Sequence, residues 1–141
     1  MASSWIEDIK VTELKTVCTD HQSMVLCAAI IKNQYIATGG KDSLIHVYNL
    51  DGTKIATLRG HSASICTIAV LNPKDNRPIL VSGGDSKCNS IVFWDTNTWT
   101  IQSKIQIHNA AVTALADCCD GQTMISGSFD KKINVINYNR A

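Results

Sequence analysis

Aromatic residues and unbalanced charge are both scarce in this chain of 141 residues. Phe, Trp and Tyr make up 6% of it, and 13 basic side chains stand against 12 acidic ones. A nucleic-acid-binding surface usually needs a clustered basic face or an aromatic stacking platform, so nucleic acid is not the expected partner. No apolar run approaches the length of a membrane span, and the first residues lack the apolar segment of a signal peptide. We therefore expect a location in the cytoplasm, with the nucleus as the alternative, and no contact with a membrane.

The sequence also lacks the motifs of common catalytic and cofactor sites. It contains no His-Glu-x-x-His motif, no nucleophile elbow and no glycine-rich loop that opens a helix. Its six cysteines show neither Cys-x-x-Cys nor zinc-finger spacing, so we expect no metal, no cofactor and no disulfide framework. Cys118 and Cys119 precede an Asp-Gly turn and are the pair most expected to be exposed. Whether they are redox active stays open.

What the chain does contain is one segment in three copies. The copies open at His21, His61 and His108, which are 40 and 47 residues apart. Each runs through an apolar strand, a second strand ending in small residues, a turn with Asp, and a third apolar strand. A unit of this length cannot bury its own apolar face and must stack on its neighbours. Such a stack offers a surface for binding and lacks a catalytic cleft, so we expect no enzyme.

The strand pattern predicts an all-β fold, since no stretch shows sustained helical periodicity. The first strands are predicted at 24–31, 64–71 and 111–116, the second at 35–40, 79–84 and 123–128, and the third at 43–49, 90–95 and 132–137. Fourth strands follow in the first two copies only, at 53–59 and 100–107, and Asp51-Gly52 marks a hairpin before the first of them. The polar segment 72–78, with two prolines, is expected to be a surface loop.

At Gly60-His61, at 82–84 (Ser-Gly-Gly) and at Trp94-Asp95 the chain resembles the WD-repeat family, whose repeats span about 40–45 residues. The resemblance covers residues 21–137. It implies a β-propeller in which each four-stranded sheet is one blade and typically 4–8 blades surround a channel. Two copies depart from the pattern, because Tyr48-Asn49 and Ile136-Asn137 stand where the second copy has Trp-Asp.

The resemblance also implies a hydrogen-bonded network in each blade, built from a His, a Ser or Thr, an Asp and a Trp. Carried over by position, its members are His21, Thr38 and Asp42, then His61, Ser82 and Trp94, then His108, Ser126 and Asp130. The acidic member of the second copy has two candidates. Counting back from Trp94 reaches Cys88, and a two-residue insertion favours Asp85 instead. A catalytic triad has no reason to occur three times in one small chain, so we interpret these residues as structural.

Propellers of this family often bind partners on the face formed by the loops that lead into the first and third strands. By position that face comprises Gln22, Met24, Lys41, Ser62, Ser64, Lys87, Asn109 and Phe129. A large aromatic in a turn suits a binding hot spot, so Phe129 is its first candidate. The alternative for Phe129 is packing against a neighbouring blade.

Counting strands predicts an incomplete ring. Residues 1–20 read as a fourth strand, at about 9–18, that precedes three repeats at 21–59, 60–107 and 108–141, and the last repeat lacks its own fourth strand. Two explanations stay open: a half-propeller that dimerises into a six-bladed ring by pairing residues 9–18 with 132–137 of a second copy, or a fragment of a longer propeller. The leading function is a non-catalytic scaffold or substrate-recruiting module for proteins or peptides. The alternative is a self-assembling structural subunit, and an enzyme is a distant third.

Overall fold

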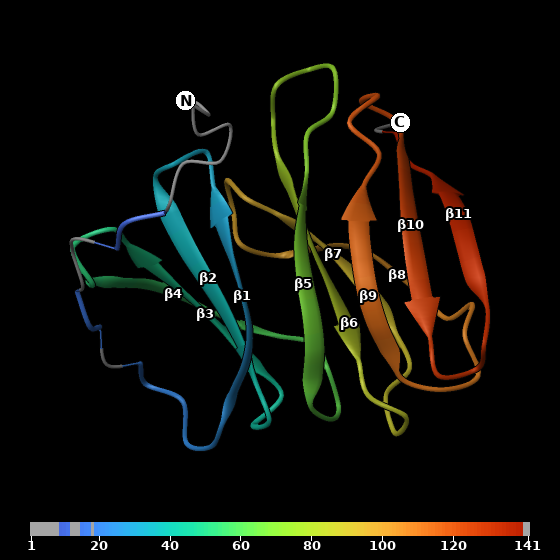
Figure 1. Cartoon of the computed structure of the whole chain (residues 1–141), viewed down its shortest axis with the longest axis horizontal. Helices are drawn as coiled ribbons and strands as arrows, with labels where there is room; N and C mark the ends of the chain where they lie inside the picture. Colours follow the sequence, from blue (N-terminus) through green and yellow to red (C-terminus); the bar gives the residue numbers. More distant parts are fainter. Residues whose placement is uncertain (1–8, 12–14, 18, 140–141) are drawn as a thin grey trace, which may run out of the picture.

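The computed structural model describes residues 9–11, 15–17 and 19–139, and every regular element in this part of the chain is a β-strand (Figure 1). The first sheet holds β1 (Val25–Ile31), β2 (Tyr35–Gly40), β3 (Leu44–Asn49) and β4 (Lys54–Arg59). The second holds β5 (Ile65–Leu71), β6 (Ile79–Gly84), β7 (Ile91–Asp95) and β8 (Ile101–Ile105). The third holds β9 (Val112–Asp117), β10 (Thr123–Ser128) and β11 (Ile133–Asn137). In this part of the chain there is no helix that could cross a membrane.

The predicted fold class is confirmed. Each sheet is antiparallel, and its strands lie in chain order, β1-β2-β3-β4, β5-β6-β7-β8 and β9-β10-β11. The three sheets stand side by side as propeller blades, with β5 between β1 and β9, and they form an arc that does not close (Figure 1). All eleven strands lie within two residues of their predicted bounds, and the three second strands match theirs at both ends.

The turns between strands repeat from blade to blade because the same small residues recur in them. The first strand of each sheet pairs with the second through a register shift at the same place, between Val25 and Cys27, between Ile65 and Thr67, and at Ser128. Gly52 has a φ of 93° in the predicted hairpin between β3 and β4, where its N–H donates to Asn49 O at 3.0 Å. Glycine reaches this left-handed region without steric cost.

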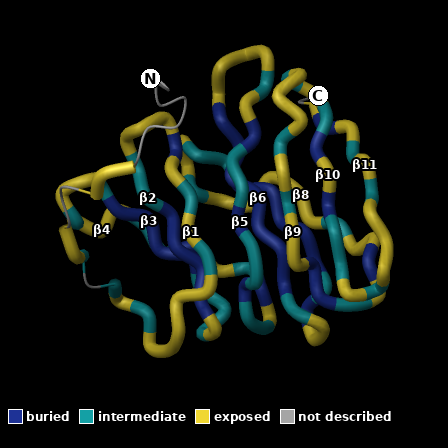
Figure 2. Tube along the Cα trace, in the orientation of Figure 1, coloured by how far each residue is buried: buried dark blue, intermediate teal, exposed yellow. Residues whose placement is uncertain are grey.

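The hydrophobic core lies between the sheets, in two clusters (Figure 2). Alternate residues of each strand point to opposite faces, so one face of the second sheet packs on the first sheet and the other on the third. Trp94 fills the first cluster together with Ile31 and Ile45. Met124 and Val112 pack with Val81 in the second. All six residues of β6 are buried, which makes this strand the centre of the molecule.

Both ends of the arc bear on the predicted strand count. No strand follows β11 among the described residues 138 and 139, and the absence of a fourth strand from the third repeat stays a prediction. Residues 9–11 and 15–17 form no strand either, so the fourth strand predicted at 9–18 is absent from the described part of that range. Residues 12–14 and 18 lie outside the described residues. The pairing of 9–18 with a second copy, and the repeat boundaries, remain predictions.

The loop at 72–78 extends from the end of the second sheet that is uppermost in Figure 1. Asn72, Lys74 and Asn76 in it are exposed, which confirms the predicted surface loop. The N–H of Asn72 donates to Asp117 Oδ2 at 3.0 Å, so the base of the loop is fastened to the third sheet.

Candidate interaction face and histidine networks

The first blade contains a histidine held on both sides. His21 precedes β1, and its Nε2 lies 2.9 Å from Thr38 Oγ1 on β2. Its Nδ1 lies 2.9 Å from an oxygen of Asp42, in the turn between β2 and β3. The N–H of Gln22 donates to the same carboxylate at 3.0 Å. Although burial opposes ionisation, the hydrogen bonds from His21 and Gln22 lower the pKa of Asp42.

The third blade repeats this geometry. His108 Nε2 lies 2.8 Å from Ser126 Oγ, and its Nδ1 lies 2.8 Å from Asp130 Oδ2. The N–H of Asn109 donates to Asp130 at 3.1 Å, as that of Gln22 does in the first blade. Against the effect of burial, these hydrogen bonds lower the pKa of Asp130 to about 2, so its carboxylate is ionised at neutral pH.

The second blade carries a thiol in place of the carboxylate. His61 Nε2 lies 2.7 Å from Ser82 Oγ, which also accepts the indole N–H of Trp94 at 2.8 Å. The Nδ1 of His61 lies 3.2 Å from Cys88 Sγ. This blade therefore has the aromatic donor that the outer two lack, and it lacks the carboxylate that they have.

The choice of Asp85 as the acidic member was wrong. Its N–H donates to Ser64 O at 2.9 Å, and Ser64 directly precedes β5. The N–H groups of Lys41 and Phe129 donate in the same way to Met24 O and Ala111 O, the residues directly before β1 and β9. Asp85 therefore matches Lys41, and the two extra residues of the second turn come after it. The spacing between this position and the aromatic residue of the third strand is therefore the same in both blades. Cys88 precedes Trp94 as Asp42 precedes Tyr48, so Cys88 occupies the position of Asp42.

The hydroxyl, imidazole and acidic groups of these networks are arranged as in a catalytic triad, but they do not form an accessible reaction centre. Ser82, His108 and Ser126 are all buried. A hydroxyl that a substrate cannot reach cannot serve as a nucleophile, whatever base it contacts. What the networks do is satisfy buried polar groups and fix the loop before each first strand to the turn between the second and third strands.

The residues of the predicted binding face lie at one end of the blades, the lower end in Figure 1, where the first strands begin. Ser64 is half-buried and the other seven are exposed: Gln22, Met24, Lys41, Ser62, Lys87, Asn109 and Phe129. Ser64 Oγ donates to Lys41 O at 3.3 Å, which joins the loops of the first two blades. Phe129 is 74% exposed, so it does not pack against the other two blades, and packing against a blade beyond the open end of the arc stays the alternative.

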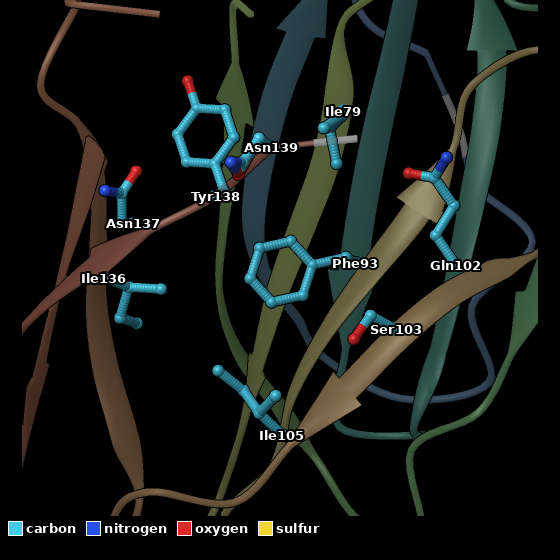
Figure 3. Close-up of a pocket in the computed structure, with 9 residues that line it drawn as sticks. All are labelled: Ile79, Phe93, Gln102, Ser103, Ile105, Ile136, Asn137, Tyr138 and Asn139. Carbon is cyan, nitrogen blue, oxygen red and sulfur yellow. The ribbon is translucent and has the colours of Figure 1, made fainter. Parts of the chain in front are cut away.

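A cavity of about 510 Å³ opens on the outer side of the molecule, between the second and third sheets (Figure 3). Phe93 and Ile105 line it from the second sheet, and Ile136 and Tyr138 from the third. The hydroxyl of Tyr138 donates to Asp117 Oδ1 at 3.1 Å, which together with burial raises the pKa of that phenol. This cavity could not be predicted from the sequence, because strands of two different sheets form it.

Comparison with known families places these features in context. The family described as "WD domain, G-beta repeat" matches residues 12–49, 52–95 and 99–137. These three matches agree with the three blades of the structure.

Curated relatives align with most of the chain. Actin-interacting protein 1 of Caenorhabditis elegans is 30% identical over 124 residues, which cover 81% of this chain and 19% of the relative. The WD repeat-containing protein slp1 of Schizosaccharomyces pombe is 29% identical over 89% of this chain and 25% of its own length. The guanine nucleotide-binding protein subunit beta of Dictyostelium discoideum is 27% identical over 74% of this chain and 30% of its own length. The chain thus spans less than a third of the length of these relatives.

Proposed function

Because this chain belongs to the WD-repeat family, we propose that it is a non-catalytic scaffold or substrate-recruiting module that binds proteins or peptides. The observation that carries the proposal is the contrast between its two groups of polar side chains. The His, Ser and Asp residues that could do chemistry lie inside or at the base of the blades. The loops that they fasten present exposed apolar and cationic side chains at one end of the molecule. Rigid blades with an exposed rim suit binding more than turnover.

The names of two relatives support the class of function. They are Actin-interacting protein 1 and, from Danio rerio, p21-activated protein kinase-interacting protein 1-like, 30% identical over 79% of this chain. Each name specifies an interaction with another protein. We place the chain in the cytoplasm, with the nucleus as the alternative.

The exposed face indicates the chemistry of the partner. Met24 and Phe129 offer apolar contact area, and Lys41 and Lys87 offer ammonium groups beside them. Aromatic and cationic side chains of this kind are complementary to a segment that combines an apolar anchor with carboxylates. We therefore propose an acidic peptide segment with at least one large apolar side chain as the ligand.

Replacing Phe129 and Lys41 by Ala should weaken binding of a captured partner about tenfold or more, since truncated hot-spot residues typically cost at least that much. Both side chains are exposed, so the melting temperature should stay unchanged. The partner is identified by affinity capture from the native source and then titrated against each purified variant.

The matched control replaces an exposed apolar residue and an exposed lysine at the opposite end of the blades, Leu50→Ala and Lys74→Ala. This control should bind as the unmodified chain does. Equal affinity of the Phe129/Lys41 variant and the unmodified chain would show that the partner uses another surface.

A second candidate function, a self-assembling structural subunit, is favoured by the free face of the third sheet. Ile133 and Val135 on β11 are both 73% exposed, and Ile125 lies beside Val135 on the same face. At the other end of the arc, Leu26 and Ile30 are exposed on the face of β1 that points away from the second sheet. Two copies related by a two-fold axis would cover both apolar faces and complete six blades.

This assembly predicts a particle of twice 15.3 kDa in light scattering. The double variant Ile133→Lys and Val135→Lys should return it to the mass of one chain, because buried, unpaired ammonium groups oppose the contact. The control Lys131→Ala and Lys132→Ala, next to the same strand, should leave the larger mass unchanged. If the unmodified chain is a monomer, the self-assembling subunit is excluded. The proposed binding module does not depend on this result.

A further inference from the structure

One buried side chain of the first sheet has no role in the fold described so far. His46 lies in the middle of β3 and is 3% exposed. Its Nδ1 lies 3.0 Å from Thr57 Oγ1 on β4. Its Nε2 is the one buried side-chain nitrogen or oxygen that lacks a hydrogen-bond partner across residues 9–11, 15–17 and 19–139. A buried polar atom without a partner is unfavourable by roughly 1–3 kcal/mol, so this atom calls for an explanation.

The repeat itself does not require a histidine at this position. His46 is opposite Thr38 in the register of β2 and β3, and the corresponding residues are Val92 opposite Ser82 and Asn134 opposite Ser126. The second blade is built with an aliphatic side chain there. The other two blades therefore act as internal references, and they show that the histidine network forms without His46.

His46 belongs to a cluster of three side chains of metal-ligand types. The rings of His21 and His46 meet edge to face, with centroids 4.4 Å apart. One ring nitrogen of each histidine and one carboxylate oxygen of Asp42 lie within 4.8 Å of one another. Ligand atoms about 2.1 Å from a zinc ion stand roughly 3.4 Å apart in a tetrahedron, so small side-chain rotations would bring the three onto one ion.

The surroundings favour a cation. The Asp42 carboxylate lies 2.9 Å from His21 Nδ1 and 3.0 Å from the backbone N of Gln22, so its oxygens face the cluster. The carboxylate of Asp20, which pairs with Lys54 at 3.0 Å, also acts electrostatically on both histidines. The Thr57 hydroxyl can accept the Nδ1 proton of His46, which leaves a lone pair on Nε2. Metal-binding histidines typically have their second nitrogen anchored in this way.

We propose that His21, Asp42 and His46 form a binding site for a divalent transition-metal ion, with zinc as the ion that fits best. Two imidazoles and one carboxylate with water in the fourth position are a usual ligand set for zinc. With His21 Nδ1 on the ion, the single proton of the neutral ring moves to Nε2, where Thr38 Oγ1 lies 2.9 Å away and can accept it. The ion would fasten His21, which precedes β1, to the centre of β3. It would thus stabilise the attachment of the segment before β1 to the first blade.

The test is a titration of the full purified chain with zinc chloride alone, by calorimetry, after treatment with a chelator. We expect one ion per chain and a rise in melting temperature with zinc concentration. His46→Val, which inserts the residue of the second blade, should weaken zinc binding at least about tenfold. Loss of a residue that only supports a metal ligand already weakens metal binding by about that factor, and His46 would be a ligand itself. The far-UV circular dichroism of His46→Val should match that of the unmodified chain. If it does not, the same titration is made with His46→Asn, which inserts the residue of the third blade.

Two further variants separate this site from adventitious binding. Cys118→Ser with Cys119→Ser removes the exposed thiols and should leave zinc binding unchanged. Asn134→His, in the third blade, places a second imidazole beside His108 and Asp130 and should raise the stoichiometry toward two. The proposal is overturned if the unmodified chain takes up no zinc, if His46→Val binds it equally well, or if the loss occurs in the cysteine variant.

Discussion

Lowering the pH from 6.5 to 4 should reduce the free energy of unfolding by about 3 kcal/mol through His61. Burial, with a smaller effect from the nearby Lys104 ammonium, lowers the pKa of His61 from 6.5 to about 4. Between these values the unfolded chain binds a proton that the folded chain does not, so stability falls as the pH falls, and this loss is complete below pH 4. One pKa unit corresponds to about 1.4 kcal/mol, which gives the stated size.

The prediction is checked by urea unfolding at a series of pH values in the presence of a chelator. Cys88→Asp should reduce the loss between pH 6.5 and 4, because a carboxylate beside Nδ1 of His61 stabilises the protonated ring. Cys88→Ser is the matched control, since it alters the same atom without adding charge, and it should keep the full loss. Identical pH profiles for the Asp and Ser variants would show that His61 does not set the acid sensitivity.

Gly83→Ala should destabilise the chain by about 1–3 kcal/mol, the usual effect of inserting a methyl group where none fits. A Cβ at this position would lie 2.8 Å from Val112 Cγ1 and 2.9 Å from Thr67 Cγ2. Val112 belongs to the third sheet, so relief of the clash would push two sheets apart. The change is measured as the free energy of unfolding in urea.

The third blade offers the matched control. Gly127 occupies the same place in its repeat, and the nearest atom to an added Cβ there is Ala114 Cβ, at 3.5 Å. This is ordinary contact, so Gly127→Ala should be neutral or stabilising by a few tenths of a kcal/mol through the unfolded chain. If both variants lose the same stability, the cost comes from the strand backbone and the packing of sheets is not its cause.

The strands and their order could be predicted from the sequence because they depend on local signals. Alternating apolar residues, the small residues at the end of β2 and β6, and the Asp51-Gly52 hairpin are each read within a few positions of the chain. The first three strands recur in every copy, so each of their signals is supported three times. The members of the outer two histidine networks followed for the same reason, since their spacings differ by no more than one residue, at 17 and 18 from His to Thr or Ser and at 21 and 22 from His to Asp.

The remaining features depend on contacts that spacing does not reveal. Whether the insertion of the second turn precedes or follows Asp85 is decided by a backbone hydrogen bond to Ser64. The unpartnered nitrogen of His46 depends on the path of β4 beside it. The cavity near Tyr138 requires the second and third sheets to be placed relative to each other. In each case the deciding contact joins different strands or loops, which a single sequence does not specify.

The complete burial of β6 between two cores makes the chain a short one-dimensional stack with unequal members. Either outer sheet can open by breaking one interface, whereas the middle sheet can open only by breaking two. In such a stack the coupling between neighbours, more than the intrinsic stability of any one unit, decides which parts open together. The exposed loops of the middle blade therefore belong to the part of the molecule that opens last. The loops beside them, Met24 and Phe129 included, belong to sheets that can fray.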